Sequence, residues 1–177
     1  MRTKLPAVAA IAVALVLSGC GGGDKTSDDD AIPTRTPPKV SPAGPFFGEC
    51  GSVTDQEVQT AFGVSSFASV TRNSVGCVWE VGGGSSAPSV SFSWYRGSPI
   101  GREAAGSDRL QRPPKPVEIR GHEGFIGQIP GQLCELGLQY GDDFMHWSVT
   151  YAGFPPFKDE CAVARELAEL TASRVQG

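Results

Sequence analysis

The feature that most constrains the fold is an alternation of apolar and polar residues with a period of two, which recurs along the middle of the chain. Successive side chains of a β-strand point to opposite faces of the sheet, so this alternation is typical of strands with one buried face. The clearest segments are residues 77–81, 89–95, 134–140 and 145–151, and shorter apolar segments at 117–119 and 121–129 predict two more strands. We therefore expect an antiparallel sheet with one apolar face and one polar face.

Three segments have the spacing or the end signals of helices. Residues 54–57 read Thr-Asp-Gln-Glu, a capping box that predicts a helix start, and Gly63 predicts the end of that helix. Residues 158–174 carry a stripe of apolar residues typical of a helix that covers a sheet, and residues 99–111 predict a weaker helix bounded by prolines. The predicted order α-β-β-α-β-β-β-β-α is that of an α+β fold, an antiparallel sheet with covering helices.

The first 20 residues have the pattern of a bacterial lipoprotein leader. Arg2 and Lys4 precede an apolar run at 7–17, and residues 17–20 read Leu-Ser-Gly-Cys. This pattern predicts that residues 1–19 are a signal peptide and that Cys20 is the lipidation site, with diacylglycerol on its sulfur and an acyl chain such as palmitate on the new amine. A transmembrane helix is the alternative, but the apolar run is well short of the ~20 residues that span a bilayer. We expect a lipid-anchored protein on the extracytoplasmic side of the cell membrane.

The composition changes sharply after Cys20. Residues 20–45 combine glycines, an acidic run at 28–30 and several prolines, which is typical of a disordered tether. Residues 46–177 are predicted to form a single domain. Removal of Arg2 and Lys4 with the leader leaves 13 basic and 19 acidic residues, a net charge of −6, which argues against a nucleic-acid partner.

Four cysteines remain once Cys20 is assigned to lipid. An even number in an oxidising compartment predicts two disulfides, with three possible pairings. We favour Cys50–Cys77 and Cys134–Cys161, since each joins segments that the strand pattern places as neighbours. A zinc site is the weaker alternative, because the spacings are long and the sequence has no Cys-x-x-Cys pair.

The sequence has no recognisable catalytic motif, and we predict no catalytic residue, cofactor or metal. His122 stands beside Glu123, but the flanking glycines indicate a tight turn, and neighbours on a strand point to opposite faces. His146 falls on the polar side of its strand, which predicts a surface histidine.

Residues 93–103 mix aromatic, cationic and turn residues more densely than any other segment. Tyr95, Arg96 and Arg102 are the candidates for a groove that takes an anionic or sugar-like ligand, with His122 as a further candidate. The structural alternative is that this segment ends a strand and turns the chain into a helix, and it is the more common use of such residues.

Several segments resemble an actinobacterial family of lipoproteins of unknown function, known from mycobacteria. The resemblance covers nearly the whole chain after the leader and is most specific at 91–103; the other segments are 45–51, 73–79, 121–126, 133–135 and 142–149. It implies a shared fold and an envelope location, and it assigns no catalytic residue.

Together these patterns predict a lipid-anchored envelope lipoprotein whose domain is a binding or accessory module for a small molecule, a lipid or an envelope protein. The alternatives are an envelope hydrolase and a protein-interaction scaffold at the membrane surface. A hydrolase requires a histidine or carboxylate pair that converges in a cleft, whereas a scaffold requires an exposed apolar patch.

Overall fold

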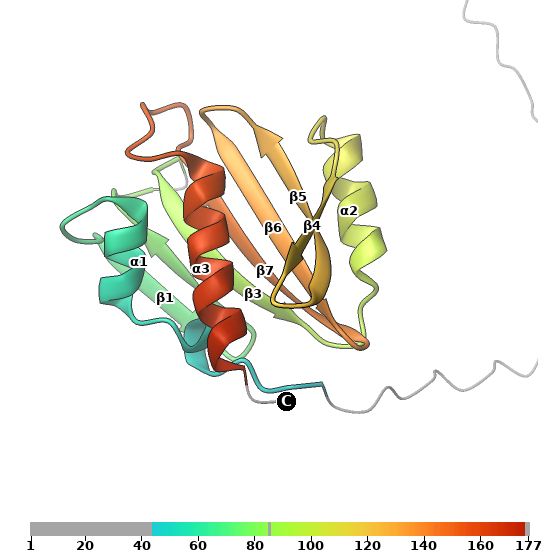
Figure 1. The fold of residues 1–177 in the computed structure, drawn as a ribbon. Helices are drawn as coiled ribbons and strands as arrows, with labels where there is room; N and C mark the ends of the chain where they lie inside the picture. Colours follow the sequence, from blue (N-terminus) through green and yellow to red (C-terminus); the bar gives the residue numbers. More distant parts are fainter. Residues whose placement is uncertain (1–43, 85, 176–177) are drawn as a thin grey trace, which may run out of the picture. The chain divides into compact units, whose positions relative to one another are not determined.

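The computed structural model describes residues 44–84 and 86–175; the predictions for the leader, for Cys20 and for nearly all of the tether lie outside these residues. Within these residues three α-helices and a seven-stranded antiparallel sheet form the predicted α+β fold, with one strand more than the six expected (Figure 1). The elements are η1 (Glu49–Ser52), α1 (Asp55–Phe62), β1 (Ser69–Asn73), β2 (Gly76–Glu80), β3 (Ser89–Tyr95), α2 (Ile100–Arg109), β4 (Lys115–Ile119), β5 (His122–Ile129), β6 (Leu133–Tyr140), β7 (Asp143–Thr150) and α3 (Glu160–Arg174).

The sheet consists of two meanders joined edge to edge. The strand order is β1-β2-β3-β7-β6-β5-β4, so β3 of the first meander pairs with β7, the last strand of the second. Ser89 lies opposite Thr150, and Tyr95 lies opposite Phe144. The predicted elements follow one another in the expected order, and β1 adds an edge strand ahead of the first predicted one.

The main core lies between one face of the sheet and the helices α1 and α3, which cross that face side by side in Figure 1. The alternating apolar residues of the central strands supply it, and its largest fully buried side chains include Trp79, Trp147, Tyr151, Leu136 and Leu167. Burial of a side chain of this size stabilises the fold by roughly 1.5–3 kcal/mol. The apolar stripe predicted for the last helix is therefore the face that α3 turns toward the sheet.

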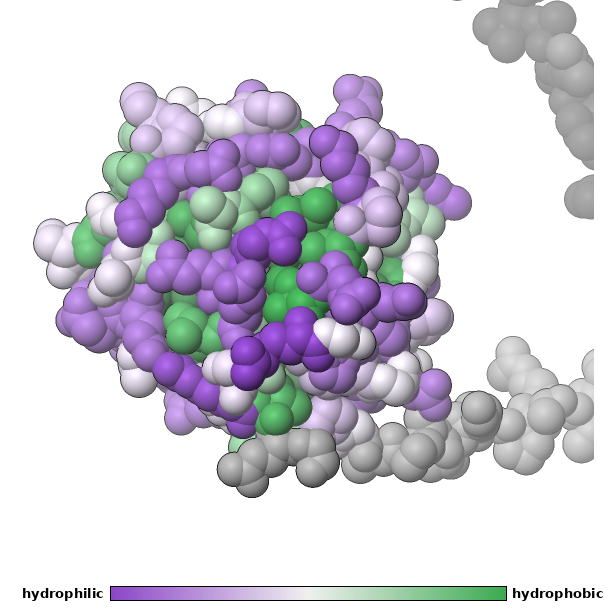
Figure 2. Space-filling view, in the orientation of Figure 1, coloured by the Kyte–Doolittle hydropathy of each residue, from purple (hydrophilic) through white to green (hydrophobic). Residues whose placement is uncertain are grey.

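Figure 2 shows this helical side of the molecule as largely polar, with apolar residues at the surface between α3 and β4. Partly buried Val117 of β4 and Ile126 of β5 pack against the main core on this side of the sheet. Within the described ranges, no helix has both the length and the apolar character to cross a membrane.

The sequence predicts that the opposite face of the sheet is polar, but this face also buries apolar residues. Helix α2 packs on β5 and β6. A Cβ atom added at Gly137 of β6 would meet both Ile100 of α2 and Phe125 of β5, which places the helix directly over these strands. Phe125 and Phe144 are buried on this second face. The prediction of one apolar and one polar face is wrong here, because α2 covers the second face beside β5 and β6.

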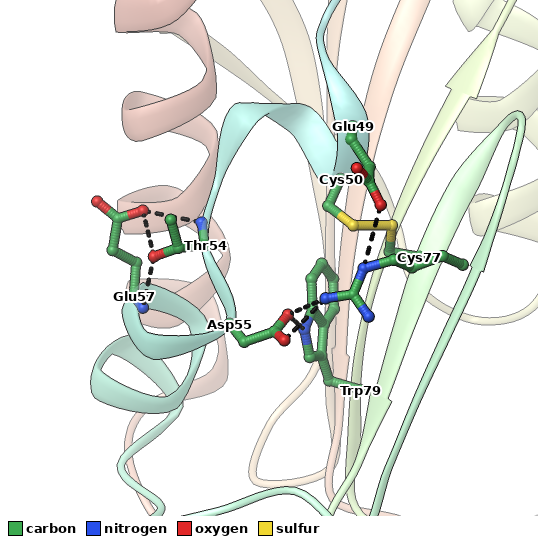
Figure 3. A network of polar contacts seen from close by, with 8 residues as sticks. Glu49, Cys50, Thr54, Asp55, Glu57, Cys77 and Trp79 are labelled. Carbon is green, nitrogen blue, oxygen red and sulfur yellow. Dashed lines mark hydrogen bonds and ion pairs between the residues drawn. A yellow bond between two sulfur atoms is a disulfide. The ribbon is translucent and has the colours of Figure 1, made fainter.

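Helix α1 is tied to the sheet by the residues that begin it (Figure 3). Thr54 caps the helix and forms the predicted capping box with Glu57. The Asp55 carboxylate accepts hydrogen bonds from Trp79 Nε1 at 2.7 Å and from Arg72 at 2.6 Å. These two bonds lower the pKa of Asp55, with the Trp79 bond as the largest cause. The first turn of α1 thus holds both β1 and β2.

Both favoured disulfide pairings are confirmed. Cys50 of η1 is bonded to Cys77 of β2, and Cys134 of β6 is bonded to Cys161 of α3. Each bridge therefore joins the sheet to an element of the layer that covers it, one bridge in each meander.

Candidate functional site

A buried polar cluster lies on the second face of the sheet, beneath the end of α2. Its centre is Glu135 of β6, which is 4% exposed, and His146 of β7, which is 7% exposed. The Glu135 carboxylate accepts a hydrogen bond from Arg112 Nε at 2.9 Å through Oε1, and its Oε2 lies 3.4 Å from His146 Nε2. Buried charged groups are rare unless they are paired or serve a function, so this cluster is the candidate site.

The C-terminal end of α2 positions the arginine. The Arg112 amide donates to the Ser107 carbonyl at 3.0 Å, and the Ser107 hydroxyl donates to the Arg112 carbonyl at 2.7 Å. Gln111 between them adopts a positive φ of 61°, which turns the chain back toward the sheet. Gly127 of β5 makes this approach possible, because a Cβ there would collide with the Ser107 hydroxyl and crowd Glu135.

Glu135 is ionised despite its burial. Burial on its own raises the pKa of this carboxyl group, but contacts with His146, Ser107 and Arg112 outweigh it and lower the pKa to about 2. The hydrogen bond from Arg112 and the other polar groups beside the carboxylate favour its charged form. The Glu135 side chain is therefore a carboxylate at neutral pH.

Two further side chains complete the surroundings of this pair. Glu103, half-buried on α2, brings a carboxylate oxygen to within 4.8 Å of the ligating atoms of both Glu135 and His146. Tyr95 of β3 is half-buried beside them, and its ring meets the His146 ring edge-on at a centroid distance of 6.3 Å. Burial raises the pKa of Tyr95, and the charges of Glu103 and Glu135 add to this shift.

The structure separates the ligand-binding residues predicted from sequence. Tyr95 lies at the cluster, where it stacks on Phe144. The Arg96 guanidinium lies 4.2 Å above the Trp94 ring, and Arg102 donates to Ser98 within the turn that leads into α2. Both contacts lie at the junction of β3 and α2.

His122 lies on the other face of the sheet from Tyr95. Its ring stacks on Tyr140 at a centroid distance of 3.8 Å, and its Nδ1 lies 3.2 Å from the Gln139 carbonyl oxygen. His122 follows the Arg120–Gly121 turn, in which both residues have positive φ, as the flanking glycines predict.

The prediction that His146 is a surface residue is wrong. The alternation correctly assigns His146 and Glu135 to the face opposite the main core, but α2 and Arg112 bury them there. The pairing of Gly137 with His146 and of Glu135 with Ser148 brings the two side chains to adjacent positions on neighbouring strands. A strand register would have been needed to find this cluster from sequence.

A second feature, at the end of the domain that carries the 81–88 connection, is an open apolar depression of about 620 Å³. Its lining includes Val81, Pro88, Ala152, Phe154 and Phe157. Phe154 and Phe157 are 54% and 43% exposed, so the depression is a hydrophobic surface with no titratable side chain in its lining.

Comparison with protein families identifies the chain. A family described as "Protein of unknown function (DUF3558)" matches residues 15–174, which is most of the sequence. The chain belongs to the DUF3558 family.

Curated relatives of the chain carry the name "Putative lipoprotein LprB". Those from Mycobacterium bovis and Mycobacterium tuberculosis are 39% identical over 171 residues, which is 94% of this chain and 92% of each relative. The relative from Mycobacterium leprae is 38% identical over 157 residues, or 86% of this chain and 83% of its own. No solved structure matches the chain. The resemblance expected from the sequence is confirmed.

Proposed function

We propose that this protein is a lipoprotein of the cell envelope, held at the extracytoplasmic face of the membrane by lipid on Cys20, and that its α+β domain is a binding module. The similarity to relatives named as lipoproteins over nearly their whole length carries the proposal. The leader pattern that ends in Leu-Ser-Gly-Cys at 17–20 supplies the chemistry for such a link.

A binding role is supported by the polar cluster beneath α2. Glu135 is charged and buried, and His146 beside it has a buried ring nitrogen without a well-formed hydrogen bond among the described residues. Such groups cost stability, by roughly 1–3 kcal/mol for an unsatisfied polar group. A fold that keeps them is consistent with selection for a ligand at this point.

The anchor is tested by Cys20→Ala in an actinobacterial host that is fed an alkyne-tagged fatty acid. We expect the variant to lose the fatty-acid label and to keep its leader, with a larger mass as a result. Ser18→Ala is the matched control, because alanine keeps a small residue at that position of the leader. Persistent labelling of Cys20→Ala would refute the anchor.

Binding is tested on the full-length lipoprotein, released from its own membrane in detergent and analysed by native mass spectrometry. We expect an additional mass that is lost on mild denaturation. A bare protein mass over several preparations would count against a stably bound ligand.

An envelope hydrolase is the second candidate, and one observation favours it: a histidine and a carboxylate converge at 3.4 Å. In a hydrolase this pair would act as a general base, and replacement of His146 by glutamine would lower kcat with the fold intact. Equal turnover of ester or amide substrates by the wild type and the variant would remove this candidate.

A further inference from the structure

We propose that Glu103, Glu135 and His146 bind one divalent transition-metal ion of the zinc class. The inference names the ligand class of the binding module proposed above, and it rests on that proposal. One imidazole and two carboxylates are a donor set that zinc accepts in proteins, with a fourth position left for water or a further ligand.

The geometry of the three donors fits a single ion. Their ligating atoms all lie within 4.8 Å of one another, and they come from α2, β6 and β7. Zinc bonds to histidine nitrogen and carboxylate oxygen at about 2.0–2.2 Å, so two ligands at adjacent corners of a tetrahedron are roughly 3.3–3.6 Å apart. The separation of His146 Nε2 and Glu135 Oε2 is 3.4 Å, which matches this edge.

His146 supplies an observation that is independent of the acidic residues. Its Nε2 is buried and lies 3.4 Å from Glu135 Oε2, within ion-pair distance, but it makes no hydrogen bond of acceptable geometry to any described residue. Buried polar atoms in native proteins almost always have a partner, so a vacant one of this kind points to a ligand. A metal ion bound to the nitrogen lone pair satisfies it.

Arg112 leaves the required oxygen free. Its guanidinium holds Oε1 of Glu135, and Oε2 remains directed toward His146. A partner that fixes a ligating carboxylate from behind is a regular feature of metal sites. Arg112 balances only one of the two carboxylates, and no ion pair within 4 Å engages Glu103 in the described part of the chain.

Glu103 is the third ligand, and it lies on the side from which a metal ion would enter the site. It is half-buried on α2, whereas the other two donors are buried. Rotation of this long side chain is the movement needed to bring its oxygen to bonding distance, and it leaves the sheet undisturbed. Metal binding is expected to fix α2 against β6 and β7.

The test uses the full-length protein in detergent, without a histidine tag, after treatment with EDTA. Zinc chloride is added in a calorimetric titration and in thermal unfolding, with magnesium chloride as the comparison ion. We expect one zinc ion per chain, a higher Tm with zinc, and no such response to magnesium.

Glu103→Gln is the decisive variant, because Glu103 is not part of the buried pair and its replacement keeps the shape of the side chain. We expect zinc affinity to fall by more than about tenfold, since loss of a ligand costs at least as much as loss of an outer partner. Glu166→Gln is the matched control, with the same change on the exposed side of α3. Circular dichroism checks that both variants fold.

Absence of stoichiometric zinc binding would overturn the proposal, and so would equal affinities of Glu103→Gln and Glu166→Gln. An organic ligand found in native mass spectrometry on a protein that binds no zinc would also overturn it. That outcome would leave the binding module in place, so the two failures are distinguishable.

Discussion

Removal of either disulfide by a double cysteine-to-alanine replacement is expected to lower the free energy of unfolding by about 3.5 kcal/mol. Cys50–Cys77 and Cys134–Cys161 each span a sequence separation of 27 residues. In the chain-entropy relation, a loop of this length loses about 12 cal/mol/K of entropy in the unfolded state. Because the two loops have the same length, removal of either bridge should lower the free energy of unfolding by nearly the same amount, although the bridges lie in different parts of the domain.

The same loss can be expressed as a melting temperature. A domain of about 130 residues unfolds with an entropy of roughly 0.27 kcal/mol/K near its midpoint, so either variant should melt about 13 °C lower. Double replacements avoid a free thiol that would exchange with the remaining bridge. Urea denaturation of both variants gives the free energies, and peptide mapping without reductant confirms which bridge remains.

The comparison between the two variants is the sharper measurement. Losses that agree within about 1 kcal/mol support a contribution from chain entropy, because the packing around the two bridges differs. A loss of less than about 1 kcal/mol in one variant, with the full loss in the other, would contradict the reasoning. It would mean that one loop is already constrained in the unfolded chain.

Two further predictions concern single residues. The hydrogen bonds of Glu57 with Arg174 and with the N-cap of α1 lower its pKa from 4.5 to about 2, so its contribution is present above pH 4.5 and is lost as the pH falls toward 2. Glu57→Gln should therefore flatten the pH dependence of stability in that range, and an unchanged curve would show that other groups dominate. Gly124→Ala should lower the free energy of unfolding, measured in urea, by about 1–3 kcal/mol, because the added Cβ would meet the Gly137 carbonyl oxygen. Gly106→Ala lies in open space on α2 and should raise the free energy of unfolding by about 0.5–1 kcal/mol. Equal effects of the two alanines would show that the strands separate to accept the methyl group.

Strands with a strict alternation were predictable almost to the residue. The segment predicted at 89–95 coincides with β3, and that at 134–140 differs from β6 by one residue. The alternation is strong there because these strands bury one face against the main core. The edge strand β1 was not predicted, since only Val70 among its residues is partly buried and the others are exposed. A strand that is exposed to solvent on both faces has no need of alternating apolar and polar residues, so its sequence shows no period of two.

Most of the candidate site could not be predicted from the sequence. Glu135 and His146 are polar residues on the side opposite the main core, where a solvated face is the ordinary expectation. Their burial depends on α2, a helix that contains Gly101 and Gly106 and gives a weak local signal. It also depends on the β6–β7 register, which aligns Gly137 with His146. Tyr95 was the one predicted site residue that the structure places at the cluster.

The pairing of β3 with β7 makes this a domain that can finish folding only at its end. Tyr95 and Phe144 are roughly 50 positions apart along the chain, and contacts of this kind form late because loop closure precedes them. During synthesis the first meander has no partner for the edge of β3 until β7 has been made, and α3, which packs on β6 and β7, follows later still. The sheet can therefore be completed only when nearly the whole domain has been synthesised.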